Sequence, residues 1–237
     1  MPYSESFAAL PPRDREIVKQ MMISQAYREL LACNMFGYCL QFVPSIKWLK
    51  FQTWHVQEEA QHYFAVAELY KKHVGEPLEQ YVMERIAQRK VTFAQSFLEL
   101  AFAQWLYDRG GFWQLHEYQG CTWEPYSTIV DKIIAEEEGH QETGRKLAVD
   151  LCNAMDDVDL SQPLFNKWLK QGLLSFGRPN SEANAYAIKR GLKKRDSGDV
   201  MIDYMNDVIP TIRECRLQLP SKEELGLELP PNIPWSL

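Results

Sequence analysis

The sequence has few features of disulfide-stabilised, membrane-spanning or nucleic-acid-binding proteins. Its five cysteines are an odd number and form no C-x-x-C pair, which argues against a zinc ribbon or a fully paired disulfide framework and favours a reducing compartment. The longest apolar-rich stretch, residues 30–43, contains Asn34 and Gln41 and is too short to span a bilayer. The net charge of −6 argues against a global basic field, so neither a nucleic-acid nor a membrane partner is expected.

The N-terminal residues MPYSESFAALPPR contain no basic segment followed by an apolar one, so no secretory signal peptide is expected. Together with the cysteine pattern, this predicts a cytoplasmic protein. The 237 residues are 46% hydrophobic, which is enough to bury one sizeable core. A single domain over residues 1–237 is the prediction.

Long stretches of the first two thirds lack proline and nearly lack glycine, and their apolar residues recur every three or four positions. Four such stretches cover residues 14–42, 46–74, 78–118 and 126–154. This period predicts four helices of roughly 25–30 residues. The fold class expected is therefore all-α, a ferritin-like four-helix bundle over about residues 13–155.

The last third, about residues 156–237, is predicted to form shorter helices and a tail. The helical stretches expected are 163–176, 181–194 and 199–218. The proline-rich residues after them predict an extended tail on the surface.

Two of the five histidines follow a glutamate by three positions. They lie in the segments EAQH, residues 59–62, and EEGH, residues 137–140. Positions i and i+3 share one face of a helix, so Glu59 with His62, and Glu137 with His140, are each arranged to hold one metal ion. Either pair by itself is more often a surface pair than a ligand pair, and it is the repetition that favours ligation.

Each pair is expected to have a partner acid on the neighbouring helix. Pro44 breaks the chain 15 residues before Glu59, and 15 residues before Pro44 stands Glu29, inside an apolar run. By the same reasoning across the break near residues 118–125, Glu99 is the partner of Glu137, although its separation of 38 exceeds the 30 from Glu29 to Glu59. A lone buried acid is costly unless it is paired or bound to a cation.

The predicted ligand set is that of carboxylate-bridged dinuclear centres. Carboxylates bridge two cations and imidazoles supply one nitrogen to each, which suits two iron ions, or manganese, better than zinc. The six predicted ligands are Glu29, Glu59, His62, Glu99, Glu137 and His140.

The residues beside these positions divide into expected supports and expected surface. Glu58 and Glu136 each precede a ligand glutamate and are predicted to reach the histidine of the opposite hairpin, with a solvated acid as the equally weighted alternative. Glu138 and Glu142 are expected to face water. Gly139 and Gly144 destabilise their helix by about 0.5–1 kcal/mol each relative to alanine, and close helix packing is the expected explanation.

The chain resembles the catalytic A subunit family of ring-1,2-phenylacetyl-CoA epoxidase, a bacterial di-iron oxygenase of ferritin-like fold. The segments that carry the resemblance are VQEEAQHY, FLELAFAQWLYD, PYSTIVDKIIAEEEGHQETG and, near the C-terminus, LLSFGRPNS and EELGLELP. The same six ligands are implied by this likeness. The family has aspartate at the positions matched to Glu58 and Glu99.

The resemblance implies a di-iron monooxygenase that takes electrons from a reductase and inserts one oxygen atom of O₂ into an organic substrate, with an aromatic CoA thioester as one candidate. It also implies a homo- or hetero-oligomer. The basic segment 188–196 is a candidate contact for CoA phosphates, although such helix-end clusters are more often solvated. The residues proposed for this contact are Lys189, Arg190, Lys193 and Lys194.

Three other functions stay open from the sequence. Ferritin-type iron oxidation and storage uses similar ligands but needs a shell and an entry path for iron. A non-catalytic structural paralogue of an oxygenase subunit, or an interaction module, is disfavoured by the complete ligand set. An oxygenase of this class with a different small-molecule substrate is equally compatible with the residues.

Overall fold

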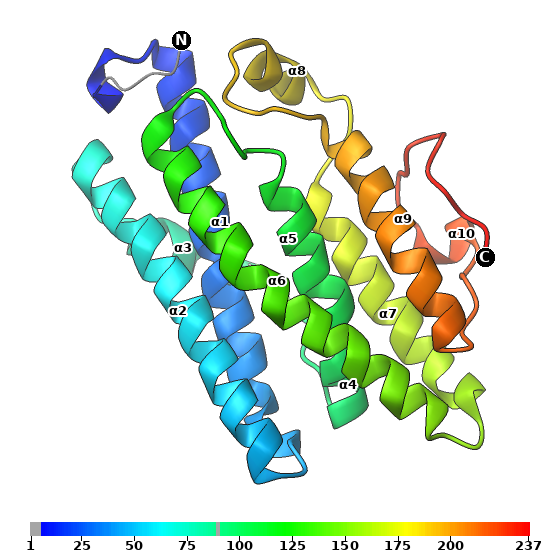
Figure 1. The fold of residues 1–237 in the computed structure, drawn as a ribbon. Coiled ribbons are helices and arrows are strands. Elements are labelled where there is room, and N and C mark those ends of the chain that lie inside the picture. The colour runs from blue at the N-terminus through cyan, green and yellow to red at the C-terminus, as the bar shows by residue number, and fades with distance from the viewer. Residues whose placement is uncertain (1–5, 89–90) are drawn as a thin grey trace.

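The computed structural model describes residues 6–88 and 91–237, and within them the protein is a helical bundle without strands (Figure 1). The N-terminal stretch inspected for a leader includes residues 1–5, which lie outside the described residues. Helices α1 (Pro12–Tyr38) and α2 (Ile46–Val74) form a long hairpin, and α6 (Glu124–Asn153) packs against both α2 and the third bundle segment. The predicted all-α, ferritin-like bundle is confirmed. No described helix has the length and apolarity needed to cross a membrane.

The ends of the long helices follow local sequence signals. Pro12 begins α1 at a position where its missing N–H costs nothing. Ser45 precedes α2 and its hydroxyl accepts from the Trp48 backbone N–H. At the other end Gly75 adopts φ +86°, a left-handed conformation that closes the helix through a bond to the Lys71 carbonyl.

The single helix predicted over residues 78–118 is wrong, because the structure divides that stretch. Helix α3 (Glu79–Gln88) packs against α1, and the chain is non-helical over residues 91–95 before α4 (Phe97–Phe102) begins; residues 89–90 lie outside the described ones. The segment Ala103–Asp108 is then a π-helix, followed by α5 (Arg109–Leu115). A new helix begins at residue 97 because Ser96 caps it, its hydroxyl accepting from the Glu99 N–H at 3.1 Å.

The C-terminal third covers the outer side of the third bundle segment. Helix α7 (Gln162–Leu173) packs on α4 and on the π-helix, and α9 (Ser197–Glu214) packs on α5 (Figure 1). Helix α8 (Glu182–Lys189) ends earlier than predicted, because Gly191 turns the chain with φ +71°. The tail predicted as extended contains a short helix, α10 (Lys222–Leu225), which a capping box starts.

Two apolar cores lie at different heights of the bundle, with a polar layer between them. On α1, residues up to Tyr27 belong to one core and residues from Ala32 onward to the other. On α6 the same division falls between Ile133 and Leu147. The predicted ligands on these two helices fall within the gap, so the cores enclose the candidate site from both ends.

The two glycines of α6 differ in what surrounds them, and this difference is testable. A Cβ at position 144 would lie 2.4 Å from Gln104 Cβ and 2.7 Å from the Trp105 backbone nitrogen, whereas a Cβ at position 139 would meet nothing within 4 Å. We expect Gly144→Ala to lower the free energy of unfolding by about 1–3 kcal/mol through overpacking. Gly139→Ala should raise it by about 0.5–1 kcal/mol through helix propensity. Urea titration of both variants checks this, and equal effects would contradict it.

Candidate metal centre

Five of the six predicted ligands meet in the polar layer of the bundle. The structure takes Glu29 from α1, Glu59 and His62 from α2, and Glu137 and His140 from α6, and all five are buried. One ligand atom each from Glu29, Glu59, His62 and Glu137 lies within 4.8 Å of the others. His140 joins them, with Nδ1 at 3.5 Å from Glu137 Oε2 and 3.8 Å from Glu59 Oε1.

Each histidine points one ring nitrogen at this cluster and the other at an acid of the opposite hairpin. His62 Nε2 lies 3.0 Å from Glu136 Oε2, and His140 Nε2 lies 2.7 Å from Glu58 Oε2. These are the contacts predicted for Glu58 and Glu136. The two Nδ1 atoms are buried and have no hydrogen-bond partner among the described residues. Such atoms are costly unless something electropositive occupies the space that they face.

The third bundle segment contributes Asp108 rather than Glu99 to this layer. The Glu99 carboxylate lies 2.8 Å from Lys167 Nζ and 2.5 Å from the Gln95 backbone nitrogen, so it completes the start of α4 and neutralises a lysine. Asp108, at the end of the π-helix, lines the same small cavity as Glu29, Glu59 and Glu137. Its Oδ2 lies 3.2 Å from Nε2 of His55, a histidine that the sequence analysis left unassigned.

Two signals in the sequence pointed to this exchange. Ser96 and Glu99 are spaced as a capping box, in which the glutamate belongs to the helix start. Asp108 and Glu137 are 29 residues apart, which matches the 30 from Glu29 to Glu59 far better than the 38 from Glu99. The role of all these side chains as ligands remains a prediction, and the structure fixes only their placement.

The electrostatics of the cluster favour positive charge. Burial, followed by repulsion from Glu137 and Glu29, raises the pKa of both Glu59 and Asp108 well above their usual range. Burial also acts to raise the pKa of Glu137, but His140 and His62 outweigh it and hold that pKa well below its usual value.

A proton on His62 balances part of this negative charge. Burial lowers the pKa of His62, but the facing carboxylates of Glu137 and Glu29 raise it to about 11. Four buried carboxylates and two unpartnered imidazole nitrogens therefore suit a pair of divalent cations, which would replace that proton.

The basic segment is mostly committed to ion pairs within the protein. Lys193 is buried, with Nζ 2.5 Å from Glu117 Oε2, and Arg190 pairs with the buried Asp14 at 2.8 Å. Their charges are needed inside because Glu117 and Asp14 are themselves buried. Lys189 and Lys194 are exposed, and the predicted phosphate contact stays a prediction for these two.

Removing the acids behind the histidines should weaken metal binding without abolishing it. We expect Glu58→Ala and Glu136→Ala each to lower metal affinity by about 10- to 100-fold, because the bond to Nε2 fixes the orientation and basicity of each imidazole. Chelator competition measures this. The exposed Glu138 supplies the control variant Glu138→Ala, and an equal loss in that control would contradict the prediction.

Comparison with known proteins gives one match. A family model described as phenylacetic acid catabolic protein covers residues 58–228. Curated proteins gave no match. The matched range begins at Glu58 and includes the second half of α2 and all of α6.

Proposed function

Because the chain belongs to the phenylacetic acid catabolic protein family, we propose that it is an O₂-dependent di-iron monooxygenase of this catabolism. In this proposal it receives electrons from a reductase and inserts one oxygen atom into an organic substrate, an aromatic CoA thioester being the leading candidate. The family supports a place in a multi-subunit oxygenase system. Two iron ions are the proposed cofactor, with manganese as the alternative metal.

The observation that carries this proposal is the pair of unpartnered Nδ1 atoms facing buried carboxylates. His62 and His140 each keep one nitrogen free on the inner side while an acid fixes the other. A structural paralogue without metal has no need for this arrangement, whose burial is costly. The residues that would hold the ions are Glu29, Glu59, His62, Asp108, Glu137 and His140. Bound iron would supply the redox chemistry that activates O₂.

With Asp108 in the set, the acid of the third segment is an aspartate. The resemblance to the epoxidase family assigns aspartate to this position, so the expected replacement by Glu99 is no longer needed. The shorter side chain reaches the cluster because the π-helix ends at Asp108, and such bulges are frequent at functional sites.

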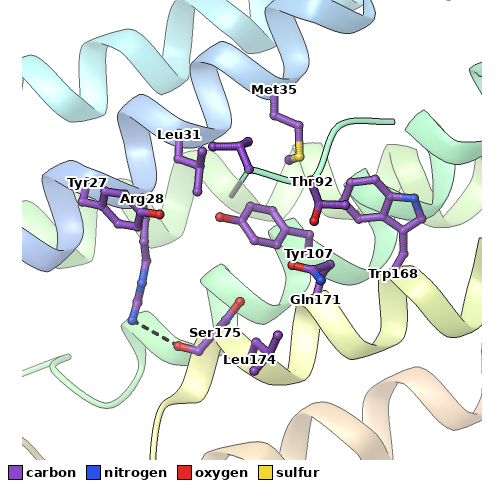
Figure 2. A pocket seen from close by; sticks show the side chains of 11 residues that line it. Tyr27, Arg28, Leu31, Met35, Thr92, Tyr107, Trp168, Gln171, Leu174 and Ser175 are labelled. Carbon is purple, nitrogen blue, oxygen red and sulfur yellow. Dashed lines mark hydrogen bonds between the residues drawn. The ribbon is translucent and has the colours of Figure 1, made fainter. Parts of the chain in front are cut away.

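A cavity of about 330 Å³ beside the cluster is the proposed substrate site (Figure 2). Arg28, Tyr107 and Ser175 line both this cavity and the small one at the carboxylates, so they form the wall between substrate and metal. Tyr27, Tyr107 and Trp168 give the larger cavity an aromatic lining, which suits a flat apolar group.

Arg28 holds this wall together. Its guanidinium donates to Gln114 Oε1 on α5 and, at 3.1 Å, to the Ser175 carbonyl (Figure 2). The Arg28 contacts therefore join α1 to the third bundle segment and to the turn after α7. A closed wall keeps water from the cluster, as an oxygenase requires.

The decisive experiment is incorporation of oxygen from ¹⁸O₂. The chain is loaded anaerobically with Fe(II), given a reductase and phenylacetyl-CoA, and exposed to ¹⁸O₂. One labelled atom in the organic product is the expected result. Accumulation of ferric iron beyond the bound ions, without labelled product, would instead indicate the storage function. Absence of iron binding would refute the metal centre.

A further inference from the structure

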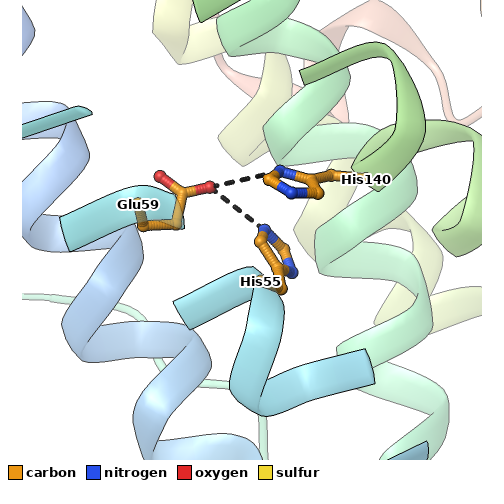
Figure 3. Close-up of side chains that lie close together, drawn as sticks. All are labelled: His55, Glu59 and His140. Carbon is orange, nitrogen blue, oxygen red and sulfur yellow. Dashed lines mark hydrogen bonds and ion pairs between the residues drawn. The ribbon is translucent and has the colours of Figure 1, made fainter. Parts of the chain in front are cut away.

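His55 is a fully buried histidine whose role the ligand set leaves open. It lies on α2 one turn before Glu59, with Nε2 at 3.0 Å from Glu59 Oε1 (Figure 3). Together with Glu59 and His140 it has the composition and spacing of a three-ligand metal site. Whether it is a ligand depends on which of its ring nitrogens carries hydrogen.

A chain of hydrogen bonds that begins at a backbone carbonyl decides this question. The Phe36 carbonyl only accepts, so the group 3.1 Å from it must be the amide nitrogen of Gln52. The oxygen of Gln52 then faces Gln104 and accepts from its Nε2 at 3.0 Å. Turning the Gln104 amide over would set two carbonyl oxygens against each other.

The second hydrogen of the same amide nitrogen points at His55. Gln104 Nε2 lies 3.0 Å from His55 Nδ1, and because the amide nitrogen only donates, Nδ1 must accept. The hydrogen of the imidazole is therefore on Nε2, the atom that faces Glu59. A nitrogen that carries hydrogen has no lone pair for a cation.

We propose that His55 is a positioning residue of the metal centre, which donates from Nε2 to Glu59 and does not bind metal. The donated hydrogen holds Glu59 Oε1, and Asp108 Oδ2 lies 3.2 Å from the same nitrogen. His55 thus fixes carboxylates from both the α1–α2 hairpin and the third segment. This inference rests on the proposed function for its metal, but not for its hydrogen-bond chain.

The fold builds this chain with two devices. Gln104 lies on the π-helix that also carries Asp108, so one local change of winding places both side chains. Gly144 lies directly against it, since a Cβ there would be 2.4 Å from Gln104 Cβ. The glycine thereby lets α6 approach the segment that holds His55.

Nitrogen NMR tests the hydrogen position directly. The full chain, labelled with ¹⁵N-histidine, is measured metal-free and loaded with Zn²⁺ by long-range ¹H–¹⁵N correlation, and the His55 signals are assigned by their loss in His55→Gln. We expect the Nε2–H tautomer in both states. An Nδ1–H tautomer, or an Nε2 signal that moves to the position of a zinc-bound nitrogen, overturns the proposal.

Metal binding separates positioning from ligation. The amide nitrogen of glutamine roughly replaces Nε2–H, and leucine has no donor, so we expect His55→Leu to weaken Fe(II) affinity by about 10- to 100-fold and His55→Gln to restore most of it. Both variants should reach wild-type iron content at saturation. A lower content in both, or equal loss of affinity, overturns the proposal. If the wild type binds no metal, the proposed function fails while the NMR result still decides the tautomer.

Discussion

Glu137→Ala should lose most of the bound iron. Glu137 is the one carboxylate close to both imidazoles, at 3.2 Å from His62 Nδ1 and 3.5 Å from His140 Nδ1. Removing it takes away the acid between the two nitrogens and leaves an empty space in a buried layer. We expect iron content after anaerobic loading and desalting to fall at least tenfold, because a lost shared ligand weakens both ions.

Glu138→Ala is the matched control for this variant. It removes the same side chain one position further along α6, where the residue is exposed. Its iron content should equal that of the wild type. Unchanged iron in Glu137→Ala, with the fold intact by circular dichroism, would refute the metal centre.

Asp108→Asn and Glu99→Gln should separate the two acids of the third segment. Asp108→Asn keeps the shape of the side chain but removes its negative charge, so we expect iron affinity to fall by at least tenfold. Glu99→Gln should keep its iron and instead destabilise the fold. It breaks the 2.8 Å pair with Lys167 and weakens the start of α4, at a cost of roughly 1–3 kcal/mol, since Lys167 stays one-third exposed.

Iron content and urea unfolding, measured on both variants, decide between the acids. Loss of iron in Glu99→Gln together with full retention in Asp108→Asn would restore Glu99 as the ligand. The two measurements are independent, so a variant that is merely unstable is recognised as such. The result also tests whether the π-helix, which ends at Asp108, belongs to the metal centre.

The repeated spacing of acids and histidines made most of the site predictable. Glu59 with His62, and Glu137 with His140, lie three apart on long helices, and the helix period places each pair on one face without tertiary information. Glu29 followed from the position of Pro44, because a short turn makes the two arms of a hairpin antiparallel. Glu58 and Glu136 followed because each is adjacent to a ligand.

The third segment was not predictable by the same means. The symmetry argument assumed one continuous helix over residues 78–118, whereas the structure has a non-helical stretch, a new start at Ser96 and a π-helix. Each change shifts the height and direction of the side chains that follow. Local periodicity carries no record of such a shift, so the choice between Glu99 and Asp108 depended on how the segment packs.

Sequence by itself determined the all-α class, the two Glu-x-x-His pairs and their expected inward direction. Their period and their place in long uninterrupted helices are local properties. Only the tertiary structure decided that Lys167 neutralises Glu99, that Asp108 enters the polar layer, and that His55 meets Gln104. These outcomes depend on contacts between segments far apart in the chain, such as Gly144 against the π-helix, where close packing and the burial of charge select one arrangement.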